Sequence, residues 1–168
     1  MKIIKISKEQ LPVIRQLAYE IWPIAYKDIL SEAQLHYMLE KFYAVYNLEN
    51  LLIHENQVFM LLESENKNIG FASYELNCNH LGTTKLHKIY IRTDIQRKNI
   101  GSFLLSEIEK TARENKQHTI FLNVNRNNNA RYFYEKMGYK ITETVDIEIG
   151  EGYLMEDYVM QKNLIDIF

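Results

Sequence analysis

The sequence is poor in cysteine, proline and glycine, with one, two and six of them in 168 residues. Because a disulfide needs two thiols and a cysteine-based zinc site needs several, the single Cys78 excludes both within the chain. A lone thiol fits a reducing compartment, so we expect a cytoplasmic protein. The N-terminus lacks the apolar core of a signal peptide, and no apolar run reaches membrane-spanning length, so we expect no membrane partner.

Neither sign of charge dominates the chain. It carries 20 Lys and Arg against 22 Asp and Glu, a net charge of −2. This balance provides no basic field, and no helix-turn-helix pattern or basic stripe is evident, so we expect no nucleic-acid partner. The five histidines show no spacing typical of metal ligands, so we expect no metal. The length predicts one domain over residues 1–168.

The pattern of apolar residues predicts a mixed α and β chain. Pro23 is expected to end or kink the first helix. Such an order of elements predicts an α+β fold, an α/β/α sandwich with helices on both faces of a mixed sheet of about seven strands. The predicted strands cover residues 2–6, 58–63, 69–76, 84–92, 119–124, 139–149 and 153–162, and the predicted helices cover residues 8–22, 32–42, 48–54, 100–112 and 128–137.

A basic, glycine-containing turn at residues 96–102 lies where a predicted strand gives way to an amphipathic helix. A helix that begins there directs several unpaired backbone N–H groups and the positive end of its dipole at one point. That arrangement is a site for a phosphate group. The alternative is a solvated loop before an ordinary helix.

A second strand and helix follow at once, and Tyr134 lies in that helix. Gly138 is placed to end the helix as a C′ glycine. Together with the phosphate site, a tyrosine here suggests a pyrophosphate-carrying cofactor beside a proton donor, which points to coenzyme A chemistry. The alternative for Tyr134 is a core aromatic beside Phe133 and Met137.

These two segments resemble motifs of the GCN5-related N-acetyltransferase superfamily. The family turn has the pattern Arg/Gln-x-x-Gly-x-Gly/Ala, to which Gln96 and Gly101 correspond, whereas Asn99 stands where the first Gly is usual. Because Asn tolerates positive φ well, we expect the turn to be kept. The stretch Asn125–Tyr139 is similar to the family segment Asn-x-x-Ala-x-x-x-Tyr-x-x-x-Gly-Phe/Tyr.

The resemblance implies an enzyme, an N-acetyltransferase that moves acetyl from acetyl-CoA directly to an amine in a ternary complex. In this family the two central parallel strands splay apart around the cofactor. Tyr134 would be the general acid, protonating the leaving thiolate or steadying its charge. The implied contacts to coenzyme A are Ile89, Tyr90 and Ile91 for the pantetheine arm, Gln96, Arg97, Lys98, Asn99, Ile100, Gly101 and Ser102 for the pyrophosphate, and Asn127, Asn129 and Tyr134.

The acceptor amine must lose a proton, because an alkylamine is mostly protonated at neutral pH. Many relatives use a Glu on the central strand, but residues 84–92 contain no carboxylate. His87 is the only side chain there that titrates near neutral pH, so it is the candidate base. The alternatives are a structural histidine and deprotonation through a water chain.

Two stretches, Leu86–Ile91 and Val145–Met160, resemble one branch of the superfamily, the PaiA-type spermidine/spermine N-acetyltransferases. The resemblance implies a small-molecule amine as substrate, with a polyamine such as spermidine or spermine as the leading prediction. The alternatives are a protein N-terminus, an amino acid or another small amine as acceptor, and a regulatory protein that binds acetyl-CoA without turnover.

The physical chemistry of the C-terminal hairpin is compatible with a polycation. Residues 141–161 include several acidic residues and no Lys or Arg. Asp146 and Glu148 share one strand face and are candidate substrate contacts, as are Trp22 and Tyr26, whose rings would contact a cationic amine. The alternatives are a solvated strand face and a core role for Trp22. The final strands would also allow a homodimer.

Overall fold

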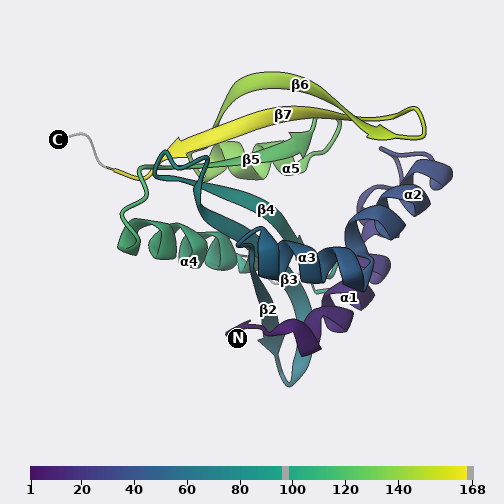
Figure 1. Ribbon diagram of the computed structural model, residues 1–168, viewed down its shortest axis with the longest axis horizontal. Coiled ribbons are helices and arrows are strands. Elements are labelled where there is room, and N and C mark those ends of the chain that lie inside the picture. Colours follow the sequence, from purple (N-terminus) through teal and green to yellow (C-terminus); the bar gives the residue numbers. More distant parts are fainter. Residues whose placement is uncertain (96–98, 166–168) are drawn as a thin grey trace.

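The computed structural model describes residues 1–95 and 99–165. Seven strands form one open mixed sheet in the order β1-β2-β3-β4-β5-β7-β6, with helices on both faces (Figure 1). This confirms the expected α+β fold. The elements are β1 (Lys2–Lys5), the short 3₁₀ helix η1 (Lys8–Gln10), α1 (Leu11–Ala25), α2 (Glu32–Tyr43), α3 (Val45–His54), β2 (Val58–Ser64), β3 (Lys67–Cys78), β4 (Thr83–Ile91), α4 (Ile100–Glu114), β5 (Thr119–Asn125), α5 (Ala130–Lys136), β6 (Lys140–Gly150) and β7 (Tyr153–Asn163).

Local residue preferences explain several element boundaries. The Ser31 hydroxyl accepts a hydrogen bond from the Gln34 backbone N–H at 3.1 Å and caps α2. Pro23 lies inside α1, which continues to Ala25. The strands predicted at residues 58–63 and 69–76 leave residues 64–68 for the β2–β3 turn, but both strands extend farther and the turn is confined to residues 65–66. Glu65 and Asn66 both have positive φ, as a two-residue hairpin turn requires, and Ser64 pairs with Lys67.

The sheet separates two hydrophobic cores. Side chains alternate along a strand, so β2 directs Phe59 and Leu61 to one face and Met60 to the other. Helices α1, α2 and α3 pack on the first face. Helices α4 and α5 pack on the second, and there the buried Glu109 of α4 forms an ion pair of 2.8 Å with Lys162 of β7. Of the helices in the described ranges, none is long and apolar enough to cross a membrane.

The sheet opens between its two central parallel strands. Strands β4 and β5 pair only from Thr83–Leu86 to Thr119–Leu122, although β4 runs on to Ile91 and β5 to Asn125. Over this last part β4 still pairs with β3, and β5 with β7. The expected splay is therefore present, and it separates the facing strand edges at the carboxyl end of β4.

The β6–β7 hairpin reaches across this opening to α2 (Figure 1). The Tyr37 hydroxyl donates a hydrogen bond of 2.6 Å to the backbone oxygen of Ile149. The Gln34 side-chain amide donates one of 2.9 Å to the backbone oxygen of Leu154. The far end of the hairpin is thus fixed to the helical layer, and a space remains beneath it.

Candidate active site

Helix α4 begins at the splay. Asn99 precedes it with φ 80° in the left-handed region, the conformation expected of a residue that stands where glycine is usual. The first N–H groups of such a helix have no partner within the helix and are available to an anion. The phosphate contacts predicted at Gln96, Arg97 and Lys98 fall on residues outside the described ranges.

Gly101 allows α4 and α5 to approach closely. A Cβ at this position would lie 3.3 Å from the Phe133 ring, which is tighter than ordinary contact. Phe133 packs in turn against Tyr134, with ring centroids 5.2 Å apart. A glycine in the first turn of α4 therefore sets the distance between the N-terminus of that helix and Tyr134.

A cavity of about 530 Å³ lies between the start of α4, the helix α5 and the end of β4. It brings together the N-terminus of α4 and the edge of β4 that is no longer paired with β5. Such a cavity fits a phosphate-bearing cofactor with an extended amide arm. Its lining includes Ile89, Ile91, Asn99, Ile100, Gly101, Ser102, Ala130, Phe133, Tyr134, Lys136 and Met137.

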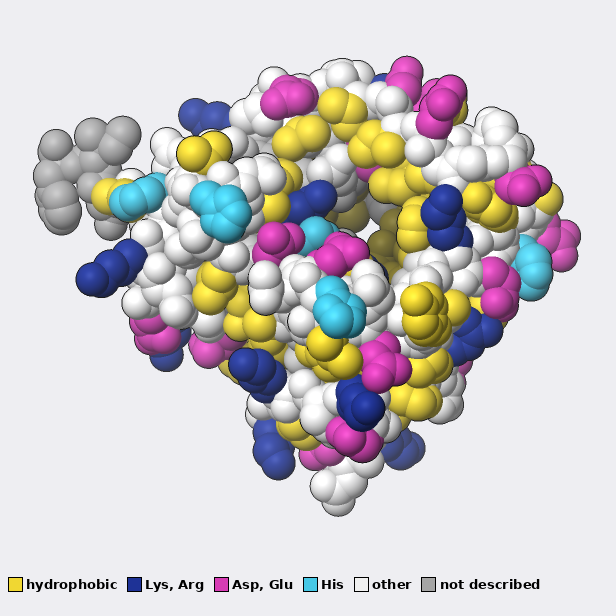
Figure 2. All heavy atoms as spheres, in the orientation of Figure 1, with side chains coloured by type: hydrophobic (Ala, Val, Ile, Leu, Met, Phe, Trp, Pro, Cys, Tyr) yellow, Lys and Arg dark blue, Asp and Glu magenta, His cyan; other side chains and the backbone are white. Residues whose placement is uncertain are grey.

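A larger cavity of about 790 Å³ lies on the other side of the splay, beneath the β6–β7 hairpin. Figure 2 shows the molecule hollowed here, with hydrophobic side chains around the opening. Four residues, Ile89, Ile91, Ala130 and Tyr134, line both cavities. Tyr134 therefore lies where the two cavities meet.

Aromatic side chains form one wall of the larger cavity. The ring centroids of Trp22 and Tyr26 are 4.7 Å apart, and the hydroxyl oxygens of Tyr26 and Tyr90 are 2.9 Å apart. Trp22 is only 4% exposed and also packs in the core. It therefore packs in the core and also lines the cavity.

Tyr134 is buried, and burial is the main cause that raises the pKa of its phenol; the nearby Tyr26 adds to the rise. Its hydroxyl therefore keeps its proton throughout the neutral range. A protonated phenol at the junction of two cavities is placed to donate to a group that develops negative charge there.

His87 also lines the larger cavity, where a bulge in β4 interrupts its pairing with β3. Burial, together with the ammonium groups of Lys85 and Lys88, lowers the pKa of His87 to about 3. Its Nε2 lies 3.0 Å from a Glu75 carboxylate oxygen. We interpret this contact as a hydrogen bond donated by a neutral ring, because two cations and burial oppose protonation.

The predicted acidic contacts lie away from the larger cavity. Ile147 and Ile149 line it, and Asp146 and Glu148 alternate with them on the strand. Asp146 forms an ion pair of 2.8 Å with Arg126 on the outer face of the hairpin.

The asparagines before α5 differ in their position relative to the two cavities. Asn128 lines the larger cavity, and its side-chain oxygen accepts a hydrogen bond of 2.9 Å from the Ala130 N–H. Asn127 and Asn129 are not among the lining residues of either cavity. Asn129 immediately precedes α5.

Five charged residues of the larger cavity were not predicted: Lys41, Glu55, Lys85, Lys88 and Asp157. Burial is the main cause that lowers the pKa of Lys88 to about 8. Asp157 is 4% exposed. Its strand neighbours at two-residue spacing, Met155 and Val159, are apolar, and this alternation was a signal that Asp157 faces inward.

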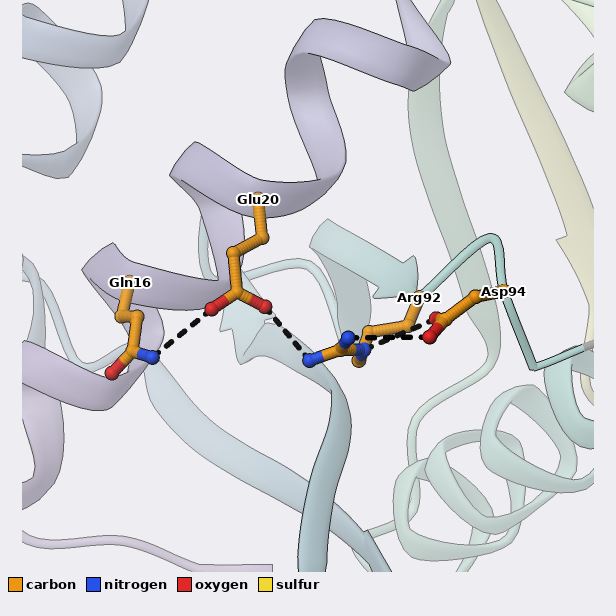
Figure 3. A network of polar contacts seen from close by, with 4 residues as sticks. All are labelled: Gln16, Glu20, Arg92 and Asp94. Carbon is orange, nitrogen blue, oxygen red and sulfur yellow. Dashed lines mark hydrogen bonds and ion pairs between the residues drawn. The ribbon is translucent and has the colours of Figure 1, made fainter.

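A network of polar contacts connects α1 to the segment that follows β4 (Figure 3). Arg92, directly after β4, forms ion pairs of 2.9 Å with Glu20 of α1 and 3.1 Å with Asp94. Gln16 donates a further hydrogen bond of 3.0 Å to Glu20. These contacts fix α1, which carries Trp22, relative to the end of β4.

A central sheet opened between two parallel strands, with a helix N-terminus and a buried tyrosine at the opening, is the architecture of an acetyltransferase. The family model described as "Acetyltransferase (GNAT) domain" matches residues 26–160, and the chain belongs to this family. The expected class of enzyme is thereby confirmed, and with it acetyl-CoA as the cofactor. Within the described residues, no cluster of side chains that would hold a metal ion is present.

The chain is similar to the spermidine N(1)-acetyltransferase of Thermoplasma acidophilum, with 27% identity over 161 residues, 93% of this chain and 96% of that protein. It is also similar to the crystal structure of PaiA N-acetyltransferase from Thermoplasma acidophilum in complex with coenzyme A. The TM-score is 0.79 at 26% identity, over 96% of this chain and 98% of that one. A GCN5-related N-acetyltransferase from Rhodopseudomonas palustris shares the fold, with a TM-score of 0.81 at 18% identity over 96% and 94% of the two chains.

Proposed function

We propose that this protein acetylates a primary amine of a polyamine such as spermidine or spermine, with acetyl-CoA as donor. The observation that carries the proposal is the position of Tyr134 at the meeting point of two cavities, one suited to the cofactor and one to the acceptor. The relative named as a spermidine N(1)-acetyltransferase supports a polyamine as acceptor.

Acetyl-CoA supplies an acetyl thioester. The proposed cofactor contacts are the N-terminal turn of α4 for the pyrophosphate and the freed edge of β4 for the pantetheine arm. The turn comprises Asn99, Ile100, Gly101 and Ser102, with Gln96, Arg97 and Lys98 before it, and the strand edge comprises Ile89, Tyr90 and Ile91. Asn127 and Asn129 are proposed to contact the cofactor from the loop before α5.

Tyr134 is proposed to act as the acid. Its protonated hydroxyl would donate to the sulfur as the bond between the acetyl carbon and the sulfur breaks. Trp22 and Tyr26 would contact the acceptor amine through their ring faces. Outside the cavity, the carboxylates of Asp146 and Glu148 would raise the local concentration of a polycation. The proposed base role of His87 is disfavoured by its lowered pKa, because a neutral ring that binds protons only near pH 3 accepts few at pH 7.

Two lysines in the larger cavity support a second class of acceptor. Lys85 and Lys88 line the larger cavity, and their ammonium groups favour an acceptor that carries a carboxylate. An amino acid or a peptide with its free carboxylate has such a group, and spermidine does not. The second candidate is therefore an N-acetyltransferase for a small amine of this kind.

Coenzyme A release from acetyl-CoA over a panel of spermidine, spermine, putrescine, amino acids and peptides tests the proposal. Saturable release with the polyamines is the expected result. Release with amino acids or peptides alone would replace the polyamine with the second acceptor class. Acetyl-CoA binding without release on any amine would favour the regulatory protein that does not turn over.

A further inference from the structure

Asp157 is the acidic residue of β7 that faces the larger cavity. Its strand neighbour Glu156 points to the outer face, where it pairs with Arg126 at 3.2 Å. Asp157 instead shares the inner face with Met155 and is 4% exposed. One hairpin thus presents a solvated carboxylate outside and a buried one toward the acceptor cavity.

The buried carboxylate has little to balance its charge. The hydrogen bond that it accepts from the Asn123 side-chain amide on β5 is long at 3.4 Å. Among the described residues, no Lys, Arg or His lies within ion-pair distance of it; the cations Lys85 on β4 and Arg126 act on it only from farther away. Burial is the main cause that raises the pKa of Asp157.

The remaining neighbours of Asp157 do not neutralise it. On β6 the residue opposite is Val145, which is apolar. Tyr26, directly after α1, is close enough for an electrostatic effect: the charge of Asp157 is one of the causes that raise the pKa of this phenol. Burying an unpaired carboxylate is costly, and a cation that enters the cavity would offset that cost.

We propose that Asp157 binds the ammonium group of the acceptor and removes its proton; the inference rests on the proposed N-acetyltransferase function. Tyr26 and Tyr134 line the same cavity, so the amine would be held beside the acid. A carboxylate whose proton affinity is raised by burial accepts a proton more readily than one in water.

Asp157 and Tyr134 together account for both protons that leave the nitrogen. The ammonium nitrogen gives one proton to the Asp157 carboxylate and becomes a neutral amine. Its electron pair forms the new bond to the acetyl carbon, and the bond from that carbon to sulfur breaks. The sulfur takes the Tyr134 proton, and Tyr134 is restored by the second proton that leaves the nitrogen. Asp157 then releases its proton to solvent.

The test is the pH profile of kcat/KM for spermidine in the Asp157→Asn variant, which keeps the shape of the side chain. We expect a loss of about 100-fold at pH 7. The loss should shrink as the pH approaches about 10, because the free amine then forms without a base. The KM for acetyl-CoA should not change. Glu114→Gln, which removes a charge from the exposed end of α4, is the control and should keep the wild-type profile.

A merely structural role would give a different result. Activity within about threefold of wild type at pH 7, or a loss that is equal at every pH, would overturn the proposal. Circular dichroism shows whether the variant is folded. If it is not, Asp157→Ala with added formate provides the second test: partial recovery of activity is expected, and no recovery in a folded protein overturns the role.

Spermidine binding to the protein saturated with coenzyme A separates this inference from the proposed function. Calorimetry should show binding about tenfold weaker in Asp157→Asn than in wild type. If spermidine binds more weakly to Asp157→Asn but the wild-type protein releases no coenzyme A, the ammonium site is kept. That result would overturn both the transfer function and the base role. Release by wild type with equal binding and equal pH profiles in the two proteins would keep the function and overturn the inference. Neither binding nor release in wild type would overturn both.

Discussion

At the scale of the residue, the proposed chemistry depends most on the hydroxyl of Tyr134. Tyr134→Phe removes this hydroxyl and leaves the ring that packs against Phe133 and Tyr139. We expect kcat for amine acetylation to fall about 100-fold while the KM for acetyl-CoA stays nearly constant. Steady-state kinetics measures both constants.

The matched control is Tyr132→Phe, on the same helix, because Tyr132 is 53% exposed. It should leave both constants unchanged. A Tyr134→Phe variant with wild-type kcat would contradict the acid role, and one in which only KM rises would indicate that Tyr134 merely helps to bind the cofactor.

The lowered pKa of His87 leads to a prediction about the pH dependence of stability rather than about activity. Its pKa is about 3 in the folded protein and about 6.5 when unfolded, so below pH 6.5 the unfolded state binds more protons. The stability that the neutral ring preserves is therefore complete above pH 6.5 and is lost as the pH falls toward 3. The free energy of unfolding should drop by up to about 1.4 kcal/mol per pH unit in this window.

His87→Gln should remove this part of the pH dependence, and His54→Gln, at an exposed position, should not. Urea unfolding between pH 7 and pH 4 gives the comparison. An unchanged slope in His87→Gln would show that the histidine is protonated in the folded protein, where it would form an ion pair with Glu75.

Single residues could be predicted well where their conformation is decided locally. Asn99 has the predicted positive φ, and Ser31 caps the predicted helix, because backbone preference and side-chain reach suffice for both. Lys88 and Asp157 could not be recognised in the same way. Alternation with Met155 and Val159 indicates that Asp157 faces inward, but distant elements form the cavity that both residues line, and no single segment of sequence contains that information.

At the scale of the element, α4 joins the cofactor site to the sheet through a buried charge. Glu109 accepts hydrogen bonds from Lys162 at 2.8 Å and from the Tyr139 hydroxyl at 3.1 Å, and it is 3% exposed. Glu109→Ala would leave the Lys162 ammonium without its partner. We expect the free energy of unfolding to fall by about 3 kcal/mol.

Urea denaturation with circular dichroism measures this loss. Glu114→Ala, on the exposed end of the same helix, is the control and should change stability by less than about 0.5 kcal/mol. Equal stability of the two variants would show that Lys162 reaches water when Glu109 is removed.

Most elements were predicted within one or two residues, since their apolar periodicity is strong. The predicted start of β3 is two residues late, because Lys67 and Asn68, which are typical of turns, pair with β2 in the sheet. The splay of β4 and β5 followed from the family resemblance. It was not evident from periodicity, since both strands keep their alternation beyond the last paired residues.

At the scale of the whole molecule, both halves of the chain contribute to one sheet and one larger cavity. Helix α1 supplies Trp22, β4 supplies Lys88 and β7 supplies Asp157. We propose on this basis that residues 1–168 act as a single domain. Consecutive residues form much of the smaller cavity, so local motifs could indicate its lining, whereas distant elements converge on the larger cavity.

The central claim is that a coenzyme A site and an acceptor cavity meet at Tyr134. A crystal structure of the protein with coenzyme A tests it most directly. The account predicts the pyrophosphate at the N-terminus of α4, the pantetheine arm along the freed edge of β4 and the thiol beside the Tyr134 hydroxyl, open to the larger cavity. A thiol that lies away from Tyr134, or an arm that does not enter the splay between β4 and β5, would contradict the account.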